Sequence, residues 1–141
     1  MMRLSFDTGR RRSAIALLLA AAIFAWEEPA SAADRSDAAR GQKLYESRCA
    51  GCHSIDAHRI GPRHRGVFGR RAGTAAGYDY SPALRASGLI WDAPTLERWL
   101  ANPTALVPGT RMGIRISDAR DRRDIIAYLR SLATLSPDRA E

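Results

Sequence analysis

Apolar residues recur at helical spacing near both ends of the chain. Between 37 and 48, one helical face carries Gly41, Leu44 and Tyr45, and Asp34 or Ser36 is expected to cap this helix. A second helix is expected to begin around Ser117 or Asp118 and to run to about Leu132, with an apolar stripe at Ile125, Ile126, Leu129 and Leu132. No useful length of sequence alternates apolar and polar residues, so we predict an all-α fold.

Two shorter helices are expected between these, one near 82–86 and one that follows Asp92 as its cap. The latter tolerates Pro94 in its first turn, ends at Asn102-Pro103, and has an apolar face of Leu96, Trp99 and Leu100. Glycine and proline interrupt residues 60–89, a loop that a small helical domain can hardly stabilise alone. The predicted fold, about four helices with long loops, therefore indicates a large apolar cofactor at its centre.

The first 32 residues have the three parts of a secretory signal peptide. Residues 1–12 contain four arginines and one aspartate, residues 14–26 are apolar, and Ala30-Ser31-Ala32 is a small-residue cleavage pattern. The alternative is an uncleaved anchor, but a bilayer span needs roughly 20 apolar residues, and Glu27-Glu28 follows the run. We predict cleavage after about Ala32, a single domain at 33–141, a periplasmic location and no membrane span in the mature chain.

The mature chain carries a modest positive charge. Without residues 1–32, the 22 basic and 15 acidic residues of the chain fall to 18 and 12, a net of +6 that is nearly all arginine. Such a charge is compatible with an acidic protein partner, a nucleic acid or a membrane surface. The scattered positions of the arginines, together with export, argue against nucleic acid.

Both cysteines and all three histidines lie between Cys49 and Gly66. Cys49-Ala50-Gly51-Cys52-His53 is C-x-x-C-H, which is typical of c-type haem attachment. Two thiols add to neighbouring vinyl groups, and in a helical turn the adjacent histidine shares their face. A thioredoxin-like pair would follow a strand, and a zinc site would need two more ligands. We therefore expect one covalently attached haem c, with Cys49 and Cys52 as anchors and His53 as an axial ligand.

Met112 is the candidate for the second axial ligand. It is the single methionine of the mature chain and follows Pro108-Gly109, 59 residues after His53. A core methionine is the alternative, but a thioether is a soft iron ligand that raises the reduction potential. His58 is expected to bond the backbone of its loop, and His64, between two arginines, is expected to face solvent; ligation through His64 is a further alternative.

The chain resembles class I cytochrome c, in its mitochondrial-type and bacterial soluble branch. The resemblance rests on the order of eight motifs over nearly all of the mature chain: CAGCH at 49–53, IGP at 60–62, GVFGR at 66–70, GYDY at 77–80, GLIW at 88–91, NP at 102–103, VPGTRM at 107–112 and IAYL at 126–129. It implies a class I cytochrome c fold, in which the first and last helices cross.

The resemblance also implies roles for the residues around the haem. The Pro62 carbonyl would accept a hydrogen bond from the His53 ring. Tyr80 and Trp91 would bond a buried propionate, and Arg70 would offset the charge of that propionate. Thr110 would bond the other propionate. Trp99 stands where a tyrosine often lies beside the methionine sulfur, and His64 stands at a usually apolar position.

The implied function is single-electron transfer between redox proteins, and not enzymatic conversion of a substrate. A dehydrogenase or bc1-type donor and an oxidase or reductase acceptor with acidic docking surfaces are the expected partners of a monomer. The alternatives are a dedicated haem subunit of a periplasmic dehydrogenase complex, a haem protein with an open sixth position, and a thiol-redox protein.

Overall fold

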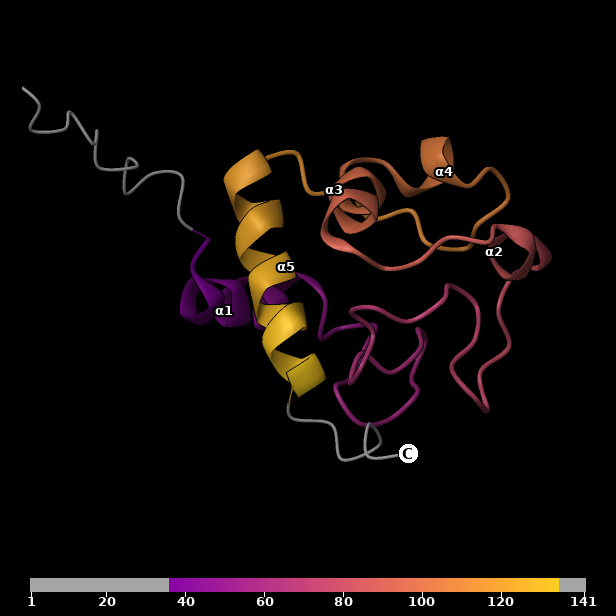
Figure 1. Cartoon of the computed structure of the whole chain (residues 1–141), viewed down its shortest axis with the longest axis horizontal. Helices are drawn as coiled ribbons and strands as arrows, with labels where there is room; N and C mark the ends of the chain where they lie inside the picture. Colours follow the sequence, from indigo (N-terminus) through magenta and orange to yellow (C-terminus); the bar gives the residue numbers. More distant parts are fainter. Residues whose placement is uncertain (1–35, 135–141) are drawn as a thin grey trace, which may run out of the picture. The chain divides into compact units, whose positions relative to one another are not determined.

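The computed structural model describes residues 36–134, which fold as a helical domain (Figure 1). Its helices are α1 (Ala38–Arg48), α2 (Pro82–Ala86), α3 (Ala93–Ala101), α4 (Pro103–Leu106) and α5 (Ala119–Thr134). Within this range the only β pairing is an isolated bridge between Arg71 and Ile90. The predicted signal peptide lies outside the described residues. No helix between 36 and 134 combines the length and the apolar character that crossing a membrane requires.

The predicted cap of α3, Asp92, is confirmed, and Ser81 and Asp118 cap α2 and α5. Asp92 and Ser81 accept the backbone N–H groups of Thr95 and Leu84, at 2.8 and 3.2 Å. The Asp118 carboxylate accepts the N–H of Asp121 at 2.8 Å at the start of α5. These oxygen acceptors satisfy N–H groups that have no partner within the first helical turn.

The cap of α1 is Asp37, and the prediction of Asp34 or Ser36 was wrong. The Asp37 carboxylate accepts the N–H groups of Ala39 and Arg40 at 2.9 and 3.0 Å. Its own backbone N–H donates to Asp124 in α5 at 2.8 Å. A contact with the far end of the chain therefore fixes where α1 begins.

The short helix α4 was not predicted. Asn102-Pro103 ends α3 as expected, but the Asn102 side chain also accepts the N–H of Ala105 at 3.3 Å. Pro103 then occupies the first helical position, where its missing N–H is harmless. The same dipeptide therefore ends one helix and begins the next.

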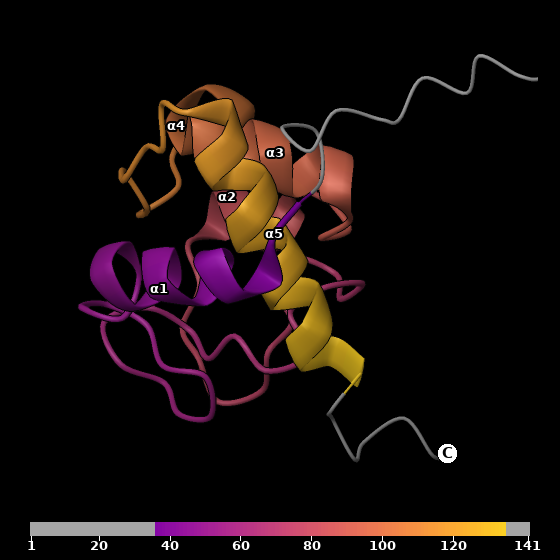
Figure 2. The ribbon, with the colours of Figure 1, turned by 90° about the vertical axis from the view of Figure 1, so that its left-hand side faces the viewer.

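Helices α1 and α5 cross at close range (Figure 2). Gly41 lies at the crossing, where an added Cβ would be 1.9 Å from the Asp124 carbonyl oxygen. The Asp124 carboxylate is completely buried and pairs with Arg40, which also pairs with Asp121. The absence of a side chain at Gly41 permits this contact, and the arginine compensates the buried charge.

Helix α3 also packs against α5, and the following loop returns alongside α3. Ile116 donates its N–H to the carbonyl of Leu100 at 2.8 Å. The long loop after α1 is tied to the segment before α3, because Trp91 donates to Arg70 at 2.9 Å and Gly69 donates to Trp91 at 3.0 Å. These bonds hold the loops as walls of an internal cavity.

Candidate functional site

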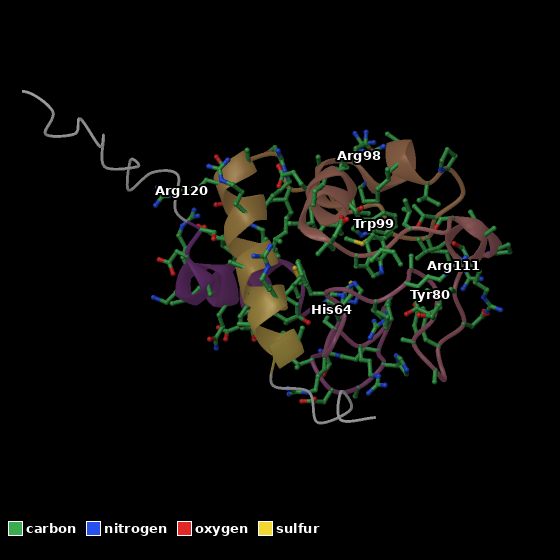
Figure 3. The ribbon with its side chains drawn as sticks, viewed as in Figure 1. His64, Tyr80, Arg98, Trp99, Arg111 and Arg120 are labelled. Atoms are coloured by element: carbon green, nitrogen blue, oxygen red, sulfur yellow. The ribbon has the colours of Figure 1, made fainter. Side chains whose placement is uncertain are left out.

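A cavity of about 500 Å³ lies inside the domain. Its wall is mainly apolar and includes residues from helices far apart in the sequence, among them Tyr45 of α1, Leu84 of α2, Trp99 of α3 and Leu129 of α5. Figure 3 labels side chains from three lining segments, His64, Tyr80 and Trp99. A volume of this size suits a cofactor-sized molecule, as expected from the loop content of the sequence.

The C-x-x-C-H motif forms one edge of the cavity. The N–H groups of Cys52 and His53 donate to the Cys49 carbonyl at 3.1 and 2.9 Å. The turn follows directly from α1, and all three residues line the cavity, with Cys49 half-buried and Cys52 exposed. One helical turn thus brings both thiols and the imidazole to the same space.

The two thiols do not form a disulfide. Burial raises the pKa of the Cys49 thiol to about 11, against the opposing effect of the Arg48 guanidinium. Thiol-redox proteins need a cysteine whose pKa is lowered. The environment of Cys49 therefore argues against a thiol-redox site.

The His53 ring is held by the segment at Gly61 and Pro62. Its Nδ1 lies 2.8 Å from the Pro62 carbonyl oxygen, so Nδ1 carries the proton and donates it. A Cβ on Gly61 would be 2.2 Å from the His53 Cε1. Burial lowers the pKa of His53, and the Pro62 carbonyl opposes that effect. The ring is thus neutral, with Nε2 free to ligate a metal.

The Met112 side chain belongs to a second lining segment. Gly109 has φ 85°, a conformation that favours glycine, and the Thr110 N–H closes the turn on Val107 at 3.1 Å. Arg111 donates to the Asp79 carbonyl at 2.9 Å, which ties this loop to the segment that carries Tyr80. Met112, Thr110 and the C-x-x-C-H turn therefore border the same cavity.

Arg70 places a positive charge in the cavity wall. Its Nε is buried and has no hydrogen-bond partner in the described part of the chain. Burial lowers the pKa of Arg70, and Tyr80 partly offsets this effect. Buried Trp91 packs against Trp99, with ring centroids 5.1 Å apart. The other two guanidinium nitrogens of Arg70 donate to the backbone carbonyls of Arg65 and Arg63. A buried cation with an unused N–H beside an apolar space fits a ligand that is apolar with an anionic group, as haem is.

His58 has the predicted structural role. Its Nε2 lies 2.8 Å from the Ala76 carbonyl, and the Arg63 N–H donates to its Nδ1 at 3.1 Å. The imidazole therefore cross-links two parts of the long loop and leaves no ring nitrogen for a metal.

His64 does not face solvent, and that prediction was wrong. Its ring stacks on the His53 ring with centroids 4.1 Å apart and planes 20° apart, and it lines the cavity. The flanking arginines suggested exposure, but backbone bonds of the loop turn His64 inward, including His64 N–H to Ser54 at 3.0 Å. Ligands on opposite haem faces cannot stack face to face, so this position does not suit a second axial ligand.

The described chain combines a helical shell, an apolar cavity and a C-x-x-C-H turn at the edge of that cavity. This combination is typical of small proteins that bind haem covalently. The family model Cytochrome c matches residues 38–133. The chain belongs to the cytochrome c family, whose members carry electrons on one covalently attached haem c and are not enzymes. Cys49 and Cys52 fit the attachment motif of that family.

Individual relatives agree with this assignment. The cytochrome c of Euglena viridis is 44% identical over 99 residues, which cover 68% of this chain and 97% of that protein. The cytochrome c of Gossypium barbadense is 41% identical over 67% of this chain and 88% of its own length. Among solved structures, cytochrome cH from Methylobacterium extorquens matches with a TM-score of 0.66 and 46% identity, over 68% of this chain and 99% of that one.

Proposed function

We propose that this protein is an exported mono-haem electron carrier whose iron is held by His53 and Met112. The observation that carries the proposal is that one apolar cavity is bordered by both the C-x-x-C-H turn and the Met112 loop. The haem, when bound, supplies the one-electron redox couple. The chain sets the ligands, their orientation and the polarity around them.

Each residue of the turn has a separate task in this proposal. Cys49 and Cys52 would anchor the haem through thioethers, and His53 would ligate the iron through Nε2. The bond from His53 Nδ1 to Pro62, at 2.8 Å, fixes the tautomer and raises the basicity of the ligand. Met112 adds a soft thioether that favours ferrous iron and raises the potential.

The remaining pocket residues receive the polar edge of the haem. The unpartnered Nε of Arg70 would offset the charge of one propionate, to which Tyr80 and Trp91 would also bond. Thr110, in the turn that carries Met112, would bond the other propionate. Trp99 would lie beside the methionine sulfur. These groups replace the water that a buried carboxylate would otherwise need.

We further propose a monomer located in the periplasm that exchanges electrons with redox proteins. Exposed Ile60 and Ile114 line the cavity, and Arg48 and Arg111 do so too. Together with Arg59, these arginines favour partners with acidic docking surfaces, mainly by speeding encounter. Nucleic acid is not a proposed partner.

The test is to isolate the exported protein and examine its cofactor. Haem must remain with the chain after denaturation, and amino-terminal sequencing must begin near Ala33. The ferric form must show the far-red band of a thioether bound to iron, and the ferrous form must not bind carbon monoxide rapidly at neutral pH. A protein without covalent haem refutes the carrier, whereas a missing far-red band refutes Met112 alone.

A further inference from the structure

His64 is a polar side chain in contact with the proposed axial ligand. Its ring centroid lies 4.1 Å from that of His53, with the two planes 20° apart. Its Nδ1 lies 3.2 Å from the Tyr45 hydroxyl, and Tyr45 is only 3% exposed. His53 therefore has an imidazole–phenol pair beside it, where an apolar side chain could have filled the same space.

The position of His64 is fixed from two sides. In the backbone, His64 donates to Ser54 at 3.0 Å, Arg65 donates to Ile55 at 2.8 Å, and Val67 donates to the His64 carbonyl at 2.9 Å. Through its side chain, His64 reaches Tyr45, whose ring lies 5.4 Å from Tyr128 in α5. The ring is thus held by the loop and by the crossing of α1 and α5.

His64 presents a flat, polar ring to His53. One face of this ring stacks on the ligand ring, and its Nδ1 is hydrogen-bonded to the Tyr45 hydroxyl. A leucine at this position would supply neither the flat face nor the hydrogen-bonding group.

We propose that His64 is a positioning residue for His53, which fixes the plane of the ligand ring and, with Tyr45, lowers the reduction potential of the protein. The inference rests on the proposed function. Ferric haem carries one more positive charge than ferrous haem, and polar, polarisable groups in place of an apolar side chain near the ligand stabilise the more highly charged ferric state more. The Pro62 carbonyl fixes one atom of the His53 ring, whereas stacking on His64 constrains the rotation of the whole plane.

The test compares His64→Leu with His64→Gln, which are similar in size and differ in polarity, and adds Tyr45→Phe. Each holoprotein is titrated potentiometrically, and proton NMR of the ferric form records the hyperfine-shifted haem methyl signals, which depend on the orientation of the axial ring. Guanidinium unfolding is measured in parallel. At the wild-type midpoint, we expect His64→Leu to raise the ferrous-to-ferric ratio about fivefold. Tyr45→Phe should raise this ferrous-to-ferric ratio by a smaller factor, and His64→Gln should leave the ratio near the wild-type value.

Changed methyl shifts in His64→Leu, with the far-red band retained, would support positioning through His53. If both His64→Leu and Tyr45→Phe have the same reduction potential and the same haem methyl shifts as the wild type, the proposal is overturned, even if their stability is lower. If His64→Leu does not mature, Tyr45→Phe decides the question alone. Wild-type protein without covalent haem would instead refute the proposed function before any variant is compared.

Discussion

Alanine at Gly41 should force the two terminal helices apart. Its Cβ would lie 1.9 Å from the Asp124 carbonyl oxygen and 2.5 Å from the carbonyl carbon, both backbone atoms of α5 that no side-chain rotation can move. Ordinary contact begins near 3.4 Å, so the helices must separate by about 1.5 Å. Overpacking of this kind costs roughly 3 kcal/mol. Alanine gains about 1 kcal/mol in helix propensity over glycine, which leaves a net loss of about 2 kcal/mol.

The assay is thermal unfolding of the holoprotein, followed by far-ultraviolet circular dichroism and by haem absorption. A loss of about 2 kcal/mol lowers the Tm of a domain of this size by roughly 10 °C. The matched control is Lys43→Ala, in the same helix at an exposed position, which should change stability by less than about 0.5 kcal/mol. If Gly41→Ala is as stable as the wild type, or is more stable because alanine favours the helix, then the close crossing of α1 and α5 does not exclude a side chain at position 41.

Three further changes test the site and the cluster of charges. Met112→Ala should remove the far-red band and lower the reduction potential, because the thioether favours ferrous iron. Asp124→Asn should destabilise the domain by about 1–3 kcal/mol in guanidinium, because the buried carboxylate serves both Arg40 and the Asp37 N–H. The Thr95 hydroxyl and N–H lower the pKa of Asp92 below its ordinary 3.8. Its stabilising effect is therefore present above that pH and is lost as pH falls through the folded pKa, so Asp92→Asn should lose less stability in acid than wild type.

Each of these predictions has an outcome that contradicts it. Rapid carbon monoxide binding should appear in Met112→Ala and not in wild type; an unchanged spectrum would assign the sixth ligand elsewhere. Wild-type stability of Asp124→Asn would show that the neutral amide serves the same donors equally well. For Asp92→Asn, acid unfolding curves that parallel wild type would mean that this cap does not contribute to the acid dependence.

The helices that were predicted are those with a local signal. The apolar stripe of α5 and the Asp92 cap depend on neighbours within a few residues, which a sequence pattern can register. Asp37 could not be distinguished from Ser36 as a cap, because its choice depends on a bond to Asp124 at the other end of the chain. Helix α4 is four residues long and has no periodicity to detect.

In the site too, some features follow from neighbouring residues in the sequence, and others depend on contacts with distant residues. The C-x-x-C-H spacing and the Met112 turn are local features, and the structure brings both to one cavity. The inward orientation of His64 comes from backbone bonds to residues 54 and 55 and from Tyr45, which the flanking arginines do not reveal. Its placement at a usually apolar position was the one signal in the sequence that pointed inward.

The crossing of α1 and α5 also limits when a haem can enter the domain. The attachment turn follows the first helix, while Ile125 and Leu129, which complete the wall of the cavity, belong to the last. Once α5 packs on α1, these side chains close one side of the cavity. A bulky cofactor is therefore expected to reach Cys49 and Cys52 before the two helices pack together, so that the last step of folding follows attachment.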